Sequence, residues 1–185
     1  MIYDINTGSK TCVKQTAIKA GFPWILDLDE DGDKETMLFT LETGYRTIEV
    51  YQKQTDGSWL LTKRIQAQAQ APERFISSPE PFKGGDGKWY VVYATTSLTP
   101  LEFYKEENTE ATGSIWIATL FDDSAPERIT PDSSISPAKR SEPEALTLPN
   151  GKTAIYYTYS FYDEELVEYT ELSTLKMARI VFSVP

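Results

Sequence analysis

Short stretches of β-branched and aromatic residues recur along the chain, separated by glycine, aspartate and proline. None shows the 3.6-residue spacing of an amphipathic helix, whereas alternation and short continuous apolar runs are typical of strands. Asp-Gly or Asn-Gly pairs, which favour tight turns, separate several of these stretches. The pattern predicts an all-β protein.

The predicted strands fall into three units with the same internal order. Each unit opens with a proline and a short strand, turns at a glycine and continues with a strong second strand. The proline and the glycine are nine, eight and eight residues apart, at Pro23 and Gly32, Pro79 and Gly87, and Pro143 and Gly151. The strands are expected at 23–26, 36–41, 47–51 and 59–65, at 79–82, 89–95, 114–120 and 127–130, and at 143–146, 153–159 and 175–182.

Units of four antiparallel strands are typical of propeller blades. We therefore expect one propeller-type domain, 1–185, with repeat units at about 22–66, 78–131 and 142–185 and with residues 1–20 as part of a further unit. Three blades fall short of the about four to eight that close a ring. The chain is then a fragment, or it is completed by the segment Thr11 to Ile18 or by a homodimer. A two-sheet β-sandwich is the alternative.

One acidic run, 27–35, has the spacing of a calcium loop, with carboxylates at alternate positions around Gly32. Calcium takes six to eight oxygen ligands, and an EF-hand loop would place a glutamate where this chain has Leu38. The run resembles the Asp-x-Asp-x-Asp-Gly-x-x-Asp loops of integrin-type and related bacterial β-propeller repeats, with glutamate at the last position. The resemblance implies Ca²⁺ bound by Asp27, Asp29, Asp31, Asp33 and Glu35. A solvated acidic turn is the alternative.

Composition excludes several classes of function. The formal net charge of −10 disfavours nucleic acid and anionic membranes as partners. The chain has no histidine, which removes Ser-His-Asp and Cys-His catalysis, and its single cysteine, Cys12, cannot form an internal disulfide. No apolar run approaches the ~20 residues of a membrane span, and no signal peptide is recognisable. The protein is then either cytoplasmic, or Met1 is an added start. Because a modest calcium site is filled outside the cytosol, we expect the second, a secreted, periplasmic or cell-surface protein.

The openings of the second and third units are similar to those of five-bladed glycoside hydrolases that act on arabinose-, xylose- or fructose-containing glycans. Ser78-Pro79-Glu80-Pro81-Phe82 precedes Gly87-Lys88-Trp89-Tyr90, and Ser141-Glu142-Pro143-Glu144-Ala145 precedes Gly151-Lys152-Thr153-Ala154. The resemblance implies catalytic carboxylates at Glu80 and Glu144, with Asp27 as a weaker candidate. One would protonate the leaving oxygen while the other attacks or activates water. The alternative is that both glutamates bind backbone amides or pair with Arg74 and Arg140.

Two insertions interrupt the second and third units at the same place, between their second and third strands. They combine carboxylates with aromatic side chains, a composition suited to sugar stacking and hydroxyl recognition. The candidate ligand-binding residues are Phe103, Tyr104, Tyr162 and Tyr169. These aromatics can equally pack on their own strands.

The sequence thus predicts a calcium-binding, extracytoplasmic, propeller-like domain that recognises carbohydrate or a protein partner. One alternative is a glycoside-hydrolase-like catalytic propeller with paired carboxylates. The other is a structural or assembly domain.

Overall fold

The computed structural model describes residues 2–3, 10–11, 20–32, 36–41, 45–67, 73–99, 102, 112–131, 138–160 and 176–182. Within these ranges the protein consists of antiparallel sheets in which each strand pairs with the next in the chain. Three of these sheets correspond to the three predicted units, which confirms the all-β prediction.

The three sheets are referred to below as blades 1, 2 and 3. Blade 1 contains β3 (Ala20–Leu26), β4 (Thr36–Leu41), β5 (Thr47–Lys53) and β6 (Trp59–Gln66). Blade 2 contains β7 (Phe75–Lys83), β8 (Trp89–Thr96), β9 (Gly113–Thr119) and β10 (Glu127–Arg128). Blade 3 contains β11 (Lys139–Thr147), β12 (Thr153–Ser160) and β13 (Lys176–Phe182).

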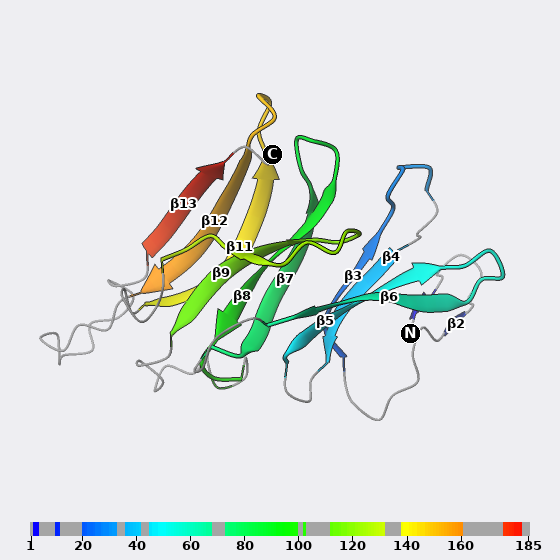
Figure 1. Ribbon diagram of the computed structural model, residues 1–185, viewed down its shortest axis with the longest axis horizontal. Coiled ribbons are helices and arrows are strands. Elements are labelled where there is room, and N and C mark those ends of the chain that lie inside the picture. The colour runs from blue at the N-terminus through cyan, green and yellow to red at the C-terminus, as the bar shows by residue number, and fades with distance from the viewer. Residues whose placement is uncertain are drawn as a thin grey trace, which may run out of the picture.

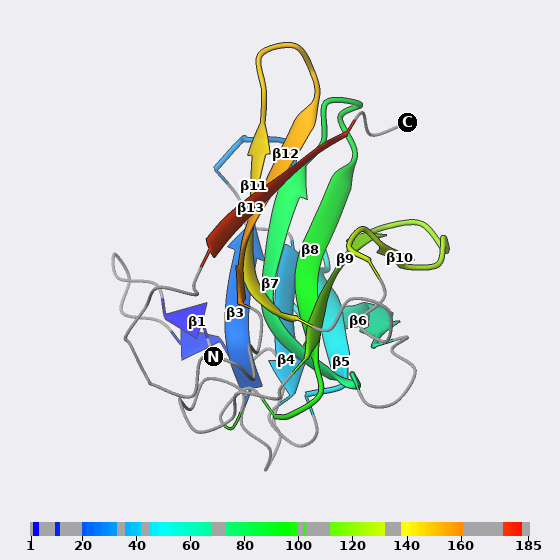
Figure 2. The ribbon, with the colours of Figure 1, turned by 90° about the vertical axis from the view of Figure 1, so that its left-hand side faces the viewer.

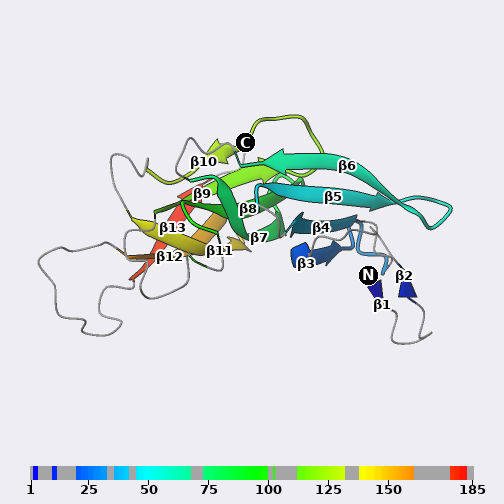
Figure 3. The same ribbon diagram turned by 90° about the horizontal axis from the view of Figure 1, so that it is seen from below.

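The blades stand side by side in chain order, with their faces packed against one another (Figure 1). Seen from the end, the first strands β3 and β7 lie on one side of the molecule, and the outer strands β6 and β10 lie on the other (Figure 2). Seen from below, the same arrangement forms an open arc, and the described strands do not close a ring (Figure 3). This is the arrangement of consecutive propeller blades and not that of a two-sheet sandwich.

Blade 2 is buried on both faces, which explains the continuous apolar run of β8. Val91 and Tyr93 belong to a core cluster shared with Ile48 of blade 1. The alternate residue Val92 belongs to a second cluster shared with Ile155 of blade 3. Because successive side chains of a strand point to opposite faces, a strand between two sheets is apolar at every position.

Each first strand contains an irregularity at the repeated proline. The registers of β3 with β4, of β7 with β8 and of β11 with β12 all shift just before or across this proline. The residue that precedes the proline has a positive φ in all three blades: 50° at Phe22, 45° at Ser78 and 52° at Glu142. Positive φ is rare for residues other than glycine, and a bulge of this kind bends its strand and redirects the following side chain.

Because of this bulge, the first strand of each blade begins earlier than predicted. The repeated prolines were expected to open their strands, but each strand begins three or four residues earlier, at Ala20, Phe75 and Lys139. Proline is compatible with a strand at a bulge because it removes a backbone donor where the ladder is already interrupted. The proline repeat therefore marks the bulge and not the strand start.

The N-terminal hairpin consists of β1 (Ile2–Tyr3) and β2 (Lys10–Thr11), which pair antiparallel. Most of the segment Thr11 to Ile18, expected to complete the last unit, lies outside the described residues. Among the described strands, β13 forms the edge of blade 3. The described part of the chain contains no helix long and apolar enough to cross a membrane.

Candidate functional site

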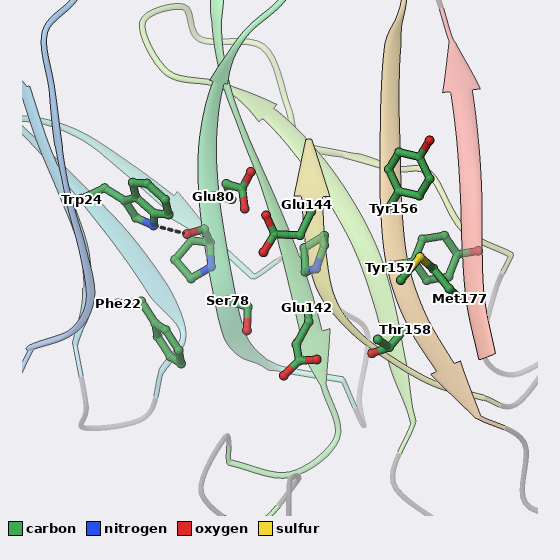
Figure 4. A pocket seen from close by; sticks show the side chains of 12 residues that line it. Phe22, Trp24, Ser78, Glu80, Glu142, Glu144, Tyr156, Tyr157, Thr158 and Met177 are labelled. Carbon is green, nitrogen blue, oxygen red and sulfur yellow. Dashed lines mark hydrogen bonds between the residues drawn. The ribbon is translucent and has the colours of Figure 1, made fainter. Parts of the chain in front are cut away.

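A pocket of about 430 Å³ lies along the inner edge of the three blades. It is formed mainly by the bulges of β3, β7 and β11 and by the adjacent part of β12, as Figure 4 shows. The residues that line it are Phe22, Trp24, Ser78, Pro79, Glu80, Glu142, Pro143, Glu144, Tyr156, Tyr157, Thr158 and Met177. The pocket therefore combines aromatic rings with three carboxyl groups.

The bulge places Trp24, Glu80 and Glu144 at one shared register position. Each is the residue after the repeated proline and the first to pair regularly with the second strand of its blade after the register shift. Neighbouring blades thus present these side chains to the same pocket (Figure 4). Glu80 and Glu144 were expected to lie at the inner strands of a common funnel, and the structure brings them together. In blade 1 the counterpart is Trp24, so Asp27 does not occupy the corresponding position.

Glu80 and Glu144 interact directly. Burial in the pocket raises the pKa of Glu80 from 4.5 to about 7, and the neighbouring carboxyl group of Glu144 acts in the same direction. The backbone N–H of Ala145 donates to Glu80 Oε1 at 3.1 Å, which opposes the rise in pKa. Near neutral pH the Glu80 carboxyl is therefore close to half protonated.

The same register position also links the blades. Trp24 Nε1 donates to the carbonyl oxygen of Pro79 at 2.7 Å, which joins blade 1 to blade 2. Glu80 accepts the N–H of Ala145, which joins blade 2 to blade 3. Each contact runs from a side chain of one first strand to the backbone of the next.

The arginines considered as alternative partners of the two glutamates make other contacts. The guanidinium of Arg74 lies 5.8 Å from the centre of the Phe75 ring. Arg140 is buried and donates to the carbonyl oxygen of Gly113 at 3.2 Å. The other alternative, in which the glutamates bind backbone amides, holds for Glu80, because Glu80 accepts the N–H of Ala145.

Sequence reasoning missed most of the pocket lining. Phe22, Ser78 and Glu142 precede the repeated prolines, and Tyr156 and Met177 come from β12 and β13. The proline repeat was the signal that could have revealed the first three, because a residue before proline in a repeated strand marks an equivalent place in every blade. The predicted ligand-binding residues Phe103, Tyr104, Tyr162 and Tyr169 lie outside the described residues.

The acidic loop after β3 brings three carboxylates together. Oxygens of Asp27, Asp29 and Asp31 all lie within 4.8 Å of one another, close enough to hold a metal ion. The loop curls back on itself, because the N–H of Gly32 donates to Asp27 Oδ2 at 2.9 Å. Leu28 packs against the core cluster between blades 1 and 2 and so anchors the loop.

The donor set of this loop fits a hard cation. Carboxylate oxygens suit Ca²⁺ or Mg²⁺, and the described residues offer no nitrogen or sulfur ligand here. Glycine at position 32 has φ = 97°, a conformation that other residues rarely adopt. The remaining predicted ligands, Asp33 and Glu35, lie outside the described residues.

Comparison with known proteins shows similarity of fold. No family model and no curated protein matches the chain. The structure of an α-L-arabinanase from Penicillium chrysogenum, complexed with arabinobiose, aligns with a TM-score of 0.52 and 19% identity, over 88% of this chain and 46% of that one. An endo-1,4-β-xylanase from Bacteroides thetaiotaomicron aligns with a TM-score of 0.46 and 12% identity, over 95% of this chain and 62% of that one.

The likeness to the arabinanase confirms a propeller-type fold, of the kind expected from the similarity of the blade openings to glycoside hydrolases. The chain spans about half the length of that arabinanase chain, as the 46% coverage shows.

Proposed function

We propose that this chain is a propeller-type carbohydrate-binding domain whose ligand occupies the pocket at the inner edge of the blades. The observation that carries the proposal is the convergence of Glu80 and Glu144 beside the indole of Trp24 in one pocket. Carboxyl oxygens bind sugar hydroxyls, and aromatic rings pack against the apolar faces of sugar rings. The likeness to an arabinanase solved with arabinobiose supports the same class of ligand.

The protonation of Glu80 suits a neutral, hydroxyl-rich ligand. With its pKa raised to about 7, its carboxyl is divided between a form that donates a hydrogen bond and a form that only accepts. Sugar hydroxyls can do both, so they match either form. The described pocket lining contains no lysine or arginine. Sugars that carry carboxylate or phosphate groups would therefore meet carboxyl groups without a compensating positive charge, and we expect them to bind poorly.

Calcium is the proposed ion of the acidic loop, held by Asp27, Asp29 and Asp31 and by the predicted ligands Asp33 and Glu35. The support is the cluster of carboxylates and their alternation around Gly32. The ion would neutralise their mutual repulsion and hold the loop between β3 and β4. A location outside the cytoplasm is part of the proposal, since calcium at millimolar levels fills a site of modest affinity.

Catalysis is the second candidate, favoured by the raised pKa of Glu80. A carboxylic acid with a pKa near 7 can protonate a leaving oxygen at neutral pH. The two carboxyl groups of a retaining glycosidase are about 5–5.5 Å apart, and those of an inverting one are about 6.5–9.5 Å apart. Hydrolysis by Glu80 and Glu144 would require one of these separations in the complex with substrate.

The test is a titration with neutral arabino-, xylo- and fructo-oligosaccharides, followed by calorimetry and by tryptophan fluorescence. Glu80→Gln and Trp24→Ala should each weaken binding at least about tenfold, equivalent to about 1.4 kcal/mol. Glu127→Gln is the matched control, because this exposed glutamate lies on the outer strand β10, and it should bind as the wild type does.

Three outcomes distinguish the candidates. Release of reducing sugar that falls at least about 100-fold in Glu144→Gln would establish catalysis. Binding without hydrolysis supports the proposal. If the wild type gives no signal with any of these oligosaccharides, the carbohydrate proposal fails, and a protein partner becomes the candidate ligand of this pocket.

A further inference from the structure

The negative charge of the pocket is concentrated where the bulges of β7 and β11 meet. Glu80, Glu142 and Glu144 all line the pocket, and its described lining contains no lysine or arginine. The carboxyl groups of Glu80 and Glu144 lie next to each other at the seam between blades 2 and 3 (Figure 4). A ligand that reaches this seam therefore meets two neighbouring carboxyl groups and no counter-charge from the described lining.

Cationic side chains on the neighbouring strands make other contacts. Lys83 Nζ lies 3.4 Å from Glu30 Oε1, in the acidic loop. The guanidinium of Arg179 lies 5.4 Å from the centre of the Tyr156 ring. Arg140, near the start of β11, donates to a backbone carbonyl oxygen. None of these three cations lines the pocket, so none of them provides a direct partner for its carboxyl groups.

Trp24 gives the same part of the pocket an aromatic surface. The indole is held in place because its Nε1 donates to the carbonyl oxygen of Pro79 at 2.7 Å, and it remains 41% exposed. In the view of Figure 4, Glu80 lies between Trp24 and Glu144. Indole is the aromatic group that attracts cations most strongly, and a carboxylate adds a charge-assisted hydrogen bond. Two carboxyl groups beside an indole therefore suit an ammonium group.

The protonation of Glu80 is consistent with a missing positive charge. Burial raises the pKa of its carboxyl to about 7, and the neighbouring Glu144 acts in the same direction. A cation placed between the two groups would favour their ionised forms and offset both effects. The pocket can thus exchange the proton of Glu80 for the positive charge of a ligand.

We propose that the sugar preferred by this pocket carries a free amine, and that its ammonium group lies between Glu80 and Glu144 next to the indole of Trp24. This inference rests on the proposed function, because it names the class of sugar that the same pocket prefers. The hydroxyls and the ring of the sugar keep the contacts proposed above. Neutral sugars of the same shape still bind, but less tightly.

Three β-1,4-linked oligosaccharides of equal length test the inference, because they differ only in the group at carbon 2. Deacetylated chito-oligosaccharides carry an ammonium group there at about pH 6. N-acetylated chito-oligosaccharides carry a neutral amide, and cello-oligosaccharides carry a hydroxyl. Calorimetry in one calcium-containing buffer should show the ammonium ligand binding at least about tenfold more tightly than either neutral ligand. Added salt should reduce this preference, because it screens the attraction between charges.

Two variants locate the preference. Glu80→Gln and Glu144→Gln should each reduce the ratio between the dissociation constants of the neutral and the ammonium ligand, because each removes a carboxylate from the proposed contact. Glu127→Gln is the matched control. It removes the same single charge from an exposed position on β10, so it should keep the wild-type ratio. Circular dichroism shows whether each variant is folded.

Each outcome decides between the two proposals. Equal or weaker binding of the deacetylated ligand overturns this inference, whereas binding of arabino-, xylo- or fructo-oligosaccharides would leave the proposed function standing. A preference that persists unchanged in both Glu80→Gln and Glu144→Gln also overturns it, because the attraction would then come from the net charge of −10 on the whole chain. If no sugar of either series binds, the inference and the proposed function fail together.

Discussion

Glu80 and Glu144 occupy the same place in consecutive blades and interact electrostatically across the blade interface. Ala145 fixes the arrangement by donating its N–H to Glu80 Oε1 at 3.1 Å. Burial of Glu80, together with the nearby charge of Glu144, keeps the Glu80 carboxyl protonated to a higher pH than that of an isolated glutamate, because its pKa is raised to about 7. Stability and ligand binding are therefore both linked to pH through this pair.

The first prediction concerns the pH dependence of stability. The pKa of Glu80 is raised from 4.5 to about 7 on folding, so its protonated form is favoured in the folded state. Its contribution is fully present below the unfolded pKa and is lost as the pH rises through about 7. Solvent screening of this partly buried pair limits the effect to about 1–2 kcal/mol. Urea unfolding at several pH values should show this decline in the wild type.

Glu80→Gln should remove that decline, because the amide stays neutral at every pH. Glu127→Gln, a substitution of the exposed glutamate on β10, should keep the wild-type profile. A profile for Glu80→Gln that parallels the wild type between about pH 5 and pH 8 would contradict the assignment of the proton to this pair.

The second prediction concerns the acidic loop. Calcium at ~100 times its dissociation constant should raise the free energy of unfolding by about 2.7 kcal/mol, because the ion binds only the folded loop. Thermal unfolding with calcium and with a chelator measures the difference. Asp29→Asn should abolish it. Asp56→Asn, in the turn between β5 and β6, should not, since Asp56 caps its own turn through the N–H of Ser58 at 2.8 Å. Equal midpoints in calcium and in chelator would refute the site.

The third prediction concerns the link from blade 1 to blade 2. Trp24→Phe removes the hydrogen bond from the indole to Pro79 and leaves that carbonyl oxygen without this donor. We expect a loss of about 0.5–1.5 kcal/mol in the free energy of unfolding. Trp89→Phe is the control, because the buried indole nitrogen of Trp89 has no hydrogen-bond partner among the described residues. If Trp24→Phe and Trp89→Phe lower the free energy of unfolding by similar amounts, the loss comes from the smaller ring that both substitutions introduce and not from the hydrogen bond.

The fourth prediction compares two buried tyrosines. The hydroxyl of Tyr93 lies in the core between blades 1 and 2 and has no hydrogen-bond partner within the described ranges. Tyr93→Phe should therefore be neutral or stabilising, since it removes an unsatisfied polar group. Tyr51→Phe should cost about 1–3 kcal/mol, because the Tyr51 hydroxyl donates to buried Glu49 at 2.8 Å. Chemical unfolding of the two variants provides the test, and a clear loss for Tyr93→Phe would contradict it.

The periodicity of the chain was sufficient to predict the strands and their grouping into units. The run from Tyr90 to Ala94 is apolar at every position because both faces of β8 are buried, and this signal is local. The turns at Gly32, Gly87 and Gly151 are local too, since each glycine has a positive φ. Neighbouring residues in the chain decide both features, so they are readable in the sequence.

The composition of the pocket was only partly readable. Glu80 and Glu144 were predicted from the similarity of their blade openings. Trp24 was not predicted, because a tryptophan does not resemble a glutamate in sequence, although it occupies the same register position in its blade. The bulge at Phe22, Ser78 and Glu142 shifts each register and turns the side chain two residues further on into the pocket. Such a shift arises from strand pairing and is not encoded by any single residue type.

The sequence by itself determined the all-β class, the order of the strands and the carboxylate spacing of the loop after β3, because these depend on side chains and turns that are neighbours in the chain. Only the tertiary structure decided that Glu80 meets Glu144, that Trp24 reaches Pro79 and that the pocket spans three blades. Those contacts depend on how whole sheets pack face to face. Packing sums many small dispersion and burial terms from distant residues, and no local pattern contains that sum.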